Sequence, residues 1–239
     1  MIQVSIIGLG NVGKALYNTL STLNGIEIKD LYNRSAIEGY NSTQSLENLS
    51  DVDICFITVS DIAITEISRQ LNFNSLIVHT SGTSEMSVLA NHNYIGVFYP
   101  LQTITPKTNF EEVPICIEAN SEENLKKLNH IAELISNRVF QINSKQRRKI
   151  HLAAVFINNF TNKMFQIGKE ICDENQIPFD IFYPIIEETA RKAILNHPKD
   201  VQTGPAKRGD LKTIELHLEQ LKSEQKEIYQ IITKSILKQ

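Results

Sequence analysis

The hydrophobic pattern divides the chain into two parts. In the first part, short continuous apolar runs alternate with stretches whose apolar residues recur at helical spacing. The runs predict strands buried on both faces of a sheet, and the periodic stretches predict helices packed against it. The predicted strands are Ile2–Ile7, Ile26–Tyr32, Asp53–Val59, Leu76–His79, Ile95–Tyr99, Pro114–Glu118 and Val139–Ile142, with helices at Asn11–Leu23, Ile62–Leu71 and Glu122–Ser136. Strands that alternate with helices indicate a parallel sheet with right-handed crossovers.

The second part of the chain predicts helices alone. They span Lys149–Asp173, Asp180–Asn196 and Leu211–Leu237, and Pro178, Pro198 and Pro205 separate them. We therefore expect an α/β domain over residues 1–144, followed by an all-α domain over residues 145–239. The connection at Asn143–Arg148 is too short for a flexible linker, so the two domains are expected to pack together.

Composition excludes several classes of protein and leaves others open. A net charge of −3 over 239 residues argues against a nucleic-acid partner, which usually requires a strongly basic surface. No apolar run approaches the length of a membrane span, and the N-terminal run predicts a strand and not a signal peptide, so we expect a cytoplasmic protein. Cys55, Cys116 and Cys172 form no C-x-x-C pair and are expected to be small buried hydrophobes. No metal site is expected, because no residues have metal-ligand spacing.

A glycine motif follows the first strand and opens the first helix. It comprises Gly8, Leu9, Gly10, Asn11, Val12 and Gly13, in the spacing G-x-G-x-x-G. In this context the first glycine permits a tight turn, the second lets a pyrophosphate approach, and the third lets helix and strand pack closely. The free amides at the start of the helix then receive the phosphates. We expect a Rossmann-type dinucleotide site, and the alternative is a glycine-rich turn without a ligand.

The end of the second strand predicts which dinucleotide binds. NAD enzymes usually carry an acidic residue here for the ribose 2′-hydroxyl, whereas this chain has Asn33, Arg34 and Ser35. Arg34 can pair with a 2′-phosphate in bidentate fashion, and Ser35 can add a hydrogen bond. This favours NADP(H), with Val59 and Ser60 at the end of the third strand completing the cofactor site. The alternatives are a solvated arginine in a turn, or an NAD enzyme that uses Asp30.

Several segments resemble known protein families. The glycine motif, the segment Tyr32–Ser35 and the strand Asp53–Val59 resemble the cofactor domains of pyrroline-5-carboxylate reductases and β-hydroxyacid dehydrogenases. A closer resemblance, to Rossmann-like proteins with an uncharacterised helical C-terminal domain, rests on His79–Gly82, Gly96–Thr103, His151–Phe156, Asn159–Asn162, Gln202–Ala206 and Arg208–Asp210. It implies a Rossmann domain and a C-terminal domain like that of 6-phosphogluconate dehydrogenase. The pyrroline-5-carboxylate reductases and β-hydroxyacid dehydrogenases dimerise through their helical domain, so the first resemblance implies a homodimer formed by that domain.

The chain departs from the related dehydrogenases at two catalytic positions. Hydroxyacyl-type enzymes carry a catalytic histidine in the segment that matches Gly96–Pro100, where this chain has Val97. Hydroxyisobutyrate-type enzymes place a lysine one turn before an asparagine, and here Ala154 precedes Asn158. Neither catalytic role can be transferred to this chain.

Other polar residues are candidates for catalysis. His151 is the predicted acid–base group, because histidine is the residue type that ordinarily changes charge near neutral pH, and Asn158 lies seven residues later on the same helical face. Ser81 follows the fourth strand and is the third catalytic candidate. A purely structural role for His151 is the alternative, and His79 is expected to be a satisfied core histidine. The active cleft is expected between the two domains.

Substrate binding is expected from both parts of the chain. The candidates are Gln102, Asn162, Thr203 and Arg208, of which Thr203 and Arg208 could hold a carboxylate. The alternative for that loop is a helix cap with an Arg208–Asp210 ion pair, and the charge run Lys145–Lys149 is expected to face solvent. The sequence thus predicts an NADP-dependent oxidoreductase that transfers hydride to or from a small carbonyl, imine or hydroxy acid. The alternative is a non-catalytic NADP(H)-binding sensor or partner protein.

Overall fold

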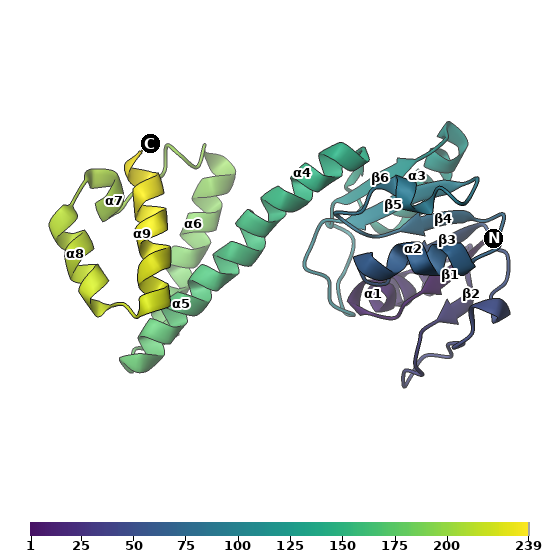
Figure 1. Cartoon of the computed structure of the whole chain (residues 1–239), viewed down its shortest axis with the longest axis horizontal. Coiled ribbons are helices and arrows are strands. Elements are labelled where there is room, and N and C mark those ends of the chain that lie inside the picture. The colour runs from purple at the N-terminus through teal and green to yellow at the C-terminus, as the bar shows by residue number, and fades with distance from the viewer. Residues whose placement is uncertain (239) are drawn as a thin grey trace. The chain divides into compact units, whose positions relative to one another are not determined.

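The computed structural model describes residues 1–238, and its first half is built on one seven-stranded sheet (Figure 1). The strands are β1 (Ile2–Ile7), β2 (Ile26–Tyr32), β3 (Ile54–Ile57), β4 (Leu76–His79), β5 (Ile95–Pro100), β6 (Ile115–Ala119) and β7 (Val139–Gln141). The helices between them are α1 (Asn11–Leu20), α2 (Asp61–Gln70) and α3 (Glu122–Ile135), with short 3₁₀ turns at Leu46–Asn48 (η1) and Met86–Leu89 (η2). Each predicted strand and helix of this half is therefore confirmed, with small shifts at the ends.

The sheet has the order β2-β1-β3-β4-β5-β6-β7 and is not purely parallel. β1 to β5 pair in parallel, but β6 is antiparallel to β5, and β7 is again parallel to β6. The prediction of a parallel sheet is thus wrong at this edge. The reason is the connection: a loop without a helix joins β5 to β6, which suits an antiparallel neighbour, whereas α3 supplies the crossover from β6 to β7.

The core lies on both faces of the sheet. One cluster joins Val4, Ile6 and Phe56 on the strands to apolar residues of α1 and α3. The other joins Ile7, Cys55, Ile57 and Ile77 to α2 and η2. Side chains alternate between faces along each strand, so helices on both sides leave the central strands β3 and β4 completely buried, as their continuous apolar runs predict, whereas the edge strands β2 and β7 are partly exposed.

The second half begins with a long helical stretch. It comprises α4 (Ser144–Ala154), a π-helical segment (Val155–Phe160, η3) and α5 (Thr161–Glu174). The start lies before the predicted Lys149, because Asn143 and Gln146 form a reciprocal capping box. The prediction that His151 and Asn158 share a face assumed an uninterrupted α-helix. The wider π-helical turn changes the angular step between them, so their shared face stays a prediction.

The remaining helices are a 3₁₀ turn at Phe179–Phe182 (η4), α6 (Tyr183–Leu195), α7 (Pro205–Arg208), α8 (Leu211–Gln220) and α9 (Ser223–Leu237). The predicted single helix Leu211–Leu237 is wrong, because Leu221 adopts an extended conformation between α8 and α9. The break lets the chain reverse, and His217 Nδ1 on α8 then lies 2.9 Å from the Tyr229 hydroxyl on α9. Ile214 of α8 is buried, and Ile228 and Ile232 of α9 line an apolar groove together with residues of α5.

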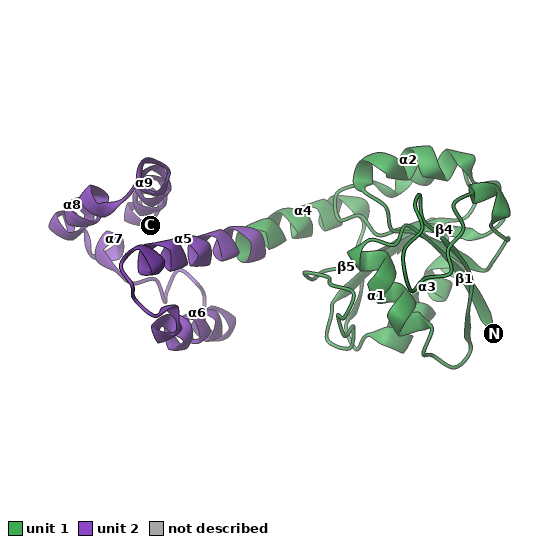
Figure 2. Cartoon of the chain, turned by 90° about the horizontal axis from the view of Figure 1, so that it is seen from below, with its two compact units in different colours: residues 1–157 green, residues 158–239 purple. Residues whose placement is uncertain are grey.

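The chain forms two compact units, residues 1–157 and 158–239 (Figure 2). The division falls within the π-helical segment, whereas the boundary predicted after residue 144 coincides with the start of α4. The predicted domain boundary, and the packing of the two domains, stay predictions. Within residues 1–238, the helices include none with the length and apolar character of a membrane span.

Candidate functional site

The glycine loop between β1 and α1 is held tightly against β3. Gly8 has a φ of +98°, a conformation that side chains disfavour, and its carbonyl oxygen accepts a 2.5 Å hydrogen bond from Thr58 Oγ1. A Cβ atom on Gly13 would overlap that same carbonyl oxygen and lie 2.6 Å from Thr58 Oγ1. The first turn of α1 therefore approaches the end of β1 more closely than any residue other than glycine would allow.

Asn33, at the end of β2, fixes the other side of the loop. Its side-chain oxygen accepts a 2.9 Å hydrogen bond from the Leu9 amide, and its Nδ2 group donates to the Ser35 carbonyl oxygen at 2.8 Å. Leu9 is itself buried. These two predicted cofactor residues thus shape the loop through contacts within the chain, and any direct contact with a ligand stays a prediction.

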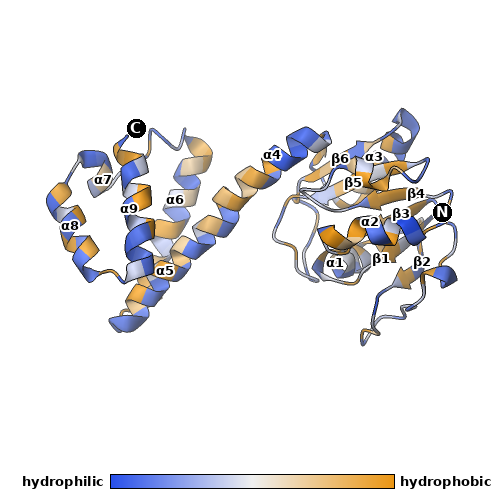
Figure 3. Ribbon diagram, viewed as in Figure 1, coloured by the Kyte–Doolittle hydropathy of each residue, from blue (hydrophilic) through white to orange (hydrophobic). Residues whose placement is uncertain are grey.

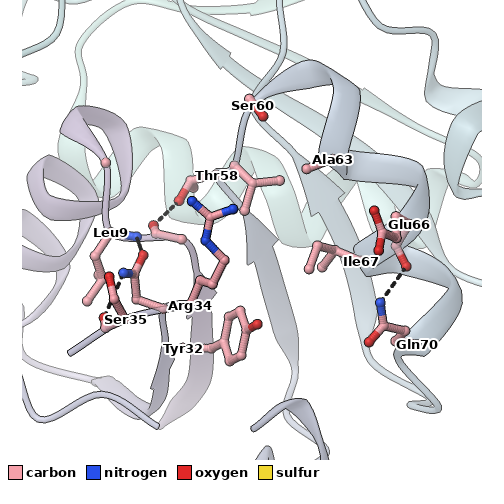
Figure 4. A pocket seen from close by; sticks show the side chains of 14 residues that line it. Leu9, Tyr32, Arg34, Ser35, Thr58, Ser60, Ala63, Glu66, Ile67 and Gln70 are labelled. Carbon is pink, nitrogen blue, oxygen red and sulfur yellow. Dashed lines mark hydrogen bonds between the residues drawn. The ribbon is translucent and has the colours of Figure 1, made fainter. Parts of the chain in front are cut away.

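A pocket of about 560 Å³ opens beside this loop (Figure 4). Of the predicted cofactor residues, it is lined by Gly8, Leu9, Gly10, Asn33, Arg34, Ser35, Val59 and Ser60. Its other lining residues, which were not predicted from the sequence, are Tyr32, Thr58, Ala63, Glu66, Ile67 and Gln70. Four of these recur at helical spacing on α2, a signal that the sequence carries, although it does not show which neighbour that face meets.

The charge distribution of the pocket suits an anion. The exposed Arg34 side chain points into the pocket between the loop and α2 (Figure 4), and its guanidinium has no hydrogen bond or ion pair within residues 1–238. Gly10 precedes α1 and provides no side-chain cap, so the amides of Asn11 and Val12 have no acceptor in the described part of the chain. A Cβ on Gly10 would meet nothing within 4 Å, which leaves space over those amides. The residues present therefore fit a dinucleotide with an additional phosphate.

A second group of side chains meets at the ends of β4 and β5. The Tyr99 hydroxyl lies 3.1 Å from Nδ1 of His151 on α4, with the two rings edge to face. Gly82 makes this contact possible, because a Cβ there would lie 2.6 Å from His151 Nδ1 and 2.8 Å from Tyr99 Cζ. Burial raises the pKa of Tyr99 above its usual value, so its hydroxyl keeps its proton at neutral pH. His151 was predicted from the sequence as a catalytic candidate, whereas Tyr99 and Gly82 were not.

His79 is a buried structural histidine, as expected. Its Nδ1 accepts a hydrogen bond from the Ser81 amide at 3.2 Å, and its Nε2 lies 3.3 Å from the Glu85 carbonyl oxygen. Burial, helped by the charge of Arg147, lowers the pKa of His79 from 6.5 to about 4.

Ser81 Oγ accepts hydrogen bonds from the amides of Thr83 and Ser84, at 3.1 Å and 2.9 Å. This hydroxyl organises the turn after β4, and its catalytic role stays a prediction.

Arg147 on α4 is fully buried and holds the helix to the sheet. Its guanidinium pairs with Glu118 on β6 at 2.5 Å and donates to the Ser84 carbonyl oxygen and to Ser144 Oγ. Ser144 Oγ donates to the same Glu118 carboxylate at 2.7 Å and accepts from the Met86 amide at 3.1 Å. These contacts join the start of α4, the end of β6 and the loop after β4.

The prediction that the charge run Lys145–Lys149 faces solvent is therefore wrong for Arg147, although Arg148 does form an exposed ion pair with Glu85. The three cysteines are free and buried, as predicted, and burial raises the pKa of Cys55 to about 12. Within residues 1–238, no three His, Cys, Asp or Glu side chains form a group that could hold a metal ion.

The remaining candidates are not brought together with these groups. Gln102 is exposed in the first unit, and its side chain accepts a hydrogen bond from the Thr103 amide. Asn158, Asn162, Thr203 and Arg208 belong to the second unit, so a site shared by both units stays a prediction. Asp210 caps α8 through Thr213, and hydrogen bonds from Thr213 lower its pKa. This agrees with the alternative of a capping loop for this segment.

The His79 environment predicts an acid-sensitive contribution to stability. Because the pKa of His79 is lower in the folded than in the unfolded chain, the unfolded chain binds a proton first as the pH falls from 6.5 towards 4. Between pH 7 and pH 5, we expect the wild type to lose about 2 kcal/mol of unfolding free energy that the His79→Gln variant does not lose. Urea titrations at both pH values measure this difference. His197→Gln, at an exposed histidine, is the control, and equal losses in wild type and His79→Gln would contradict the expectation.

Substitutions of Gly13 and Gly10 are expected to affect different properties, the first stability and the second NADPH affinity. Gly13→Ala would force backbone atoms apart, so we expect it to lower the unfolding free energy by about 3 kcal/mol. Gly10→Ala places its methyl group in open space, so stability should change by less than about 0.5 kcal/mol. Only NADPH affinity should then fall, because the methyl group occupies the space over the amides. Thermal unfolding and calorimetry separate the effects, and unchanged affinity in a stable Gly10→Ala protein would count against this phosphate position.

Comparison with solved structures extends over the whole chain. A candidate NADP oxidoreductase from Bacteroides fragilis is 33% identical, with a TM-score of 0.87, and the match covers 100% of this chain and 98% of that one. A protein from Thermotoga maritima is 21% identical, with a TM-score of 0.72, covering 98% and 96% of the two chains. A 1-pyrroline-5-carboxylate reductase from Streptococcus pyogenes shares the fold at 14% identity, with a TM-score of 0.63 over 100% and 99% of the chains.

No protein of curated function matches this chain in sequence. The model of one family, described as a domain of unknown function (DUF2520), matches residues 113–236. This match and the Bacteroides relative confirm the resemblance to Rossmann-like proteins with an uncharacterised helical C-terminal domain, and the fold class expected from it. The chain thus belongs to the DUF2520 family.

Proposed function

We propose that this protein is an NADP(H)-dependent oxidoreductase that transfers a hydride to or from a small carbonyl, imine or hydroxy-acid substrate. The observation that carries the proposal is the guanidinium of Arg34, which lines the glycine-loop pocket without a partner within residues 1–238. The 2′-phosphate distinguishes NADP(H) from NAD(H), and a bidentate guanidinium is suited to hold it. The relative from Bacteroides fragilis, whose name includes NADP oxidoreductase, supports the same assignment.

Each phosphate of NADP(H) would be held by a different part of the pocket. The amides of Asn11 and Val12 would hold the pyrophosphate, and Arg34 with Ser35 would hold the 2′-phosphate. Glu66 lines the pocket from α2, and its negative charge disfavours a phosphate on that side, which directs the phosphate towards Arg34. When bound, NADPH supplies the hydride.

The substrate is expected near the ends of β4 and β5. In this fold, ligands bind outside the carboxyl ends of the strands, which is where the Tyr99–His151 contact lies. The side chain of Asn158 would orient a carbonyl, and that of Arg208 would bind a carboxylate. Gln102, Asn162 and Thr203 would complete substrate binding, as the sequence predicts.

A non-catalytic NADP(H)-binding sensor is the second candidate. It is favoured by the two catalytic positions of related dehydrogenases that this chain does not keep. Val97 is completely buried in β5 and cannot transfer a proton, and Ala154 lies where a lysine would be expected.

One screen distinguishes these candidates. It follows nicotinamide absorbance with NADPH or NADP⁺ and a panel of probes: 1-pyrroline-5-carboxylate as an imine, pyruvate as an oxo acid and lactate as a hydroxy acid. Turnover of any probe supports the enzyme. Tight NADPH binding without turnover of a broadened panel of the same classes supports the sensor.

The Arg34 assignment predicts a selective loss of affinity. In Arg34→Ala the charge-assisted contacts to the 2′-phosphate disappear, so NADPH binding should weaken by about 1.5–3 kcal/mol. Binding of NADH, which has no such phosphate, should change little. Isothermal titration calorimetry measures both, with Arg69→Ala, an exposed arginine of α2 outside the pocket, as the control. Unchanged NADPH affinity in Arg34→Ala would contradict the assignment.

We also propose a homodimer formed by the helical unit. Among residues 158–238 only Cys172, Ala206 and Ile214 are buried, although α5, α6, α8 and α9 all carry hydrophobic residues (Figure 3). The most exposed large hydrophobic side chains of this unit are Ile181, Ile185, Ile194, Leu195, Leu211 and Ile231. An apolar groove of about 420 Å³ lies between α5 and α6. Such a small core with so much exposed apolar surface is stabilised when a partner covers that surface. A second copy of this chain would cover it with the same apolar face.

The dimer predicts how charged substitutions act. Ile185 lines the groove and is 60% exposed, so Ile185→Glu should place a charge in the interface and shift the protein towards monomer. Ile62→Glu, at an isoleucine of α2 that is 94% exposed, should leave the dimer intact. Light scattering at micromolar concentration gives the mass of each protein. A monomeric wild type would count decisively against the proposal.

A further inference from the structure

The contact between Tyr99 and His151 carries an inference about proton transfer. The two groups come from different elements, the end of β5 and the second turn of α4, and Gly82 leaves the space in which they meet. The geometry points to the Tyr99 hydroxyl as the proton donor of the reaction, with His151 as the positioning residue that supplies it with a new proton. This inference rests on the proposed function, because it names a catalytic group for that same site.

The position of Tyr99 on the sheet supports the assignment. The glycine-loop pocket lies over the ends of β1 and β2, whereas Tyr99 is at the end of β5, three strands from β1. In Rossmann-type sheets a dinucleotide extends along this edge, with its reactive half on the far side of the switch point from the adenosine half. Tyr99 is therefore on the side of the sheet where hydride transfer is expected.

The surroundings of Tyr99 suit a donor. The hydroxyl is half-buried, so water competes less with a bound substrate, and burial keeps it protonated at neutral pH. The other ionisable groups near it are Cys116 on β6, Arg147 on α4 and Asp61 on α2. Arg147 is held in its ion pair with Glu118, and the thiol of Cys116 is buried with a raised pKa. His151 is the neighbour that forms a hydrogen bond with the hydroxyl and also reaches solvent.

The neighbouring candidates are engaged in other contacts. The Ser81 hydroxyl already accepts hydrogen bonds from the amides of Thr83 and Ser84. The ring of His79 is buried between the Ser81 amide and the Glu85 carbonyl, and it is neutral at physiological pH. Ser81 Oγ is thus held in place by the turn that it organises, and the Nε2 proton of His79 is directed at a backbone carbonyl, so Tyr99 is the better-placed donor at this edge of the sheet.

The step balances as a reduction. The substrate carbon of a C=N or C=O group gains the hydride of NADPH, with its two electrons, and the π electron pair moves to the nitrogen or oxygen. That atom takes the proton of the Tyr99 hydroxyl. The tyrosinate then recovers a proton from Nδ1 of the His151 imidazolium, which is refilled from solvent. Overall, one NADPH and one proton reduce the double bond and leave NADP⁺.

Substitutions of Tyr99 and His151 test this sequence of proton transfers. In Tyr99→Phe, kcat on a turned-over probe such as 1-pyrroline-5-carboxylate should fall about a hundredfold or more, with NADPH affinity and melting temperature nearly unchanged. His151→Ala should show a loss of similar size, and the double variant should lose no more than the larger single loss, because both groups serve one proton path. The control is Tyr94→Phe, an exposed tyrosine just before β5, which should keep full activity.

Two readouts need no substrate. In protein labelled with ¹³C at tyrosine and histidine rings, the Tyr99 ring should show a nuclear Overhauser effect to the nicotinamide C4 proton of bound NADP⁺. The Tyr99 ring-carbon shift should also follow the titration of His151, and this link should vanish in His151→Ala. A third variant, Gly82→Ala, keeps both groups but pushes them apart, so it should abolish the same link.

The outcomes separate this inference from the proposed function. If the wild type binds NADPH but the Overhauser effect is absent, or if Tyr99→Phe turns over a probe at the wild-type rate, the assignment of Tyr99 is overturned and the proposed function stands. If the wild type binds neither NADPH nor NADP⁺, the proposed function fails, and the inference fails with it. If no probe is turned over, the two spectroscopic readouts alone decide the assignment.

Discussion

The buried ion pair between Arg147 and Glu118 is the constraint on which the candidate active site depends. A guanidinium with no exposed surface is stable only when its charge is compensated, and removing one member of such a pair typically costs about 3–5 kcal/mol. The pair therefore fixes the start of α4 against β6. His151 follows Arg147 by four residues and so projects from the same face of the helix. The ion pair thereby determines where the His151 ring meets Tyr99.

A second constraint acts at the other end of the sheet edge. The Gly8 carbonyl oxygen is held by Thr58, the Leu9 amide is held by Asn33, and the closeness of Gly13 to Gly8 leaves no room for a side chain. With these groups satisfied inside the chain, the amides at the start of α1 remain for a ligand. The loop is thus preorganised, and a bound phosphate does not have to meet the entropic cost of ordering it.

The parts of the fold that follow from local pattern could be predicted from the sequence. β1, β2 and β4 have the predicted ends, because continuous apolar runs bounded by turns specify a buried strand. The antiparallel pairing of β6 could not be predicted, since it depends on a long-range choice of neighbour that no local period encodes. The break at Leu221 contains neither glycine nor proline, so no local signal marks it, and its role becomes visible only where His217 of α8 meets Tyr229 of α9.

In the candidate site too, residues in a local motif could be predicted, whereas residues that depend on distant contacts could not. The glycine spacing and Arg34 were identifiable because each is tied to a strand end by a fixed distance in sequence. Arg147 was misjudged, because a run of charged residues gives no sign that one member finds a carboxylate on β6. Tyr99 was passed over for a similar reason. Its importance comes from His151, fifty-two residues later, and from the space left by Gly82.

The register of the sheet relates Tyr99 to the catalytic position that this chain lacks. Val97 pairs with His79 on β4 and with Glu118 on β6, so these three residues form one row across the sheet. Tyr99 lies two residues further along β5, on the same face, and about 6.6 Å nearer the carboxyl end. The completely buried Val97 packs against its neighbours, while a tyrosine at the edge reaches both His151 and the space beyond the strands. The proton donor proposed here therefore lies on the same strand and face as Val97, displaced by one step towards the ligand edge.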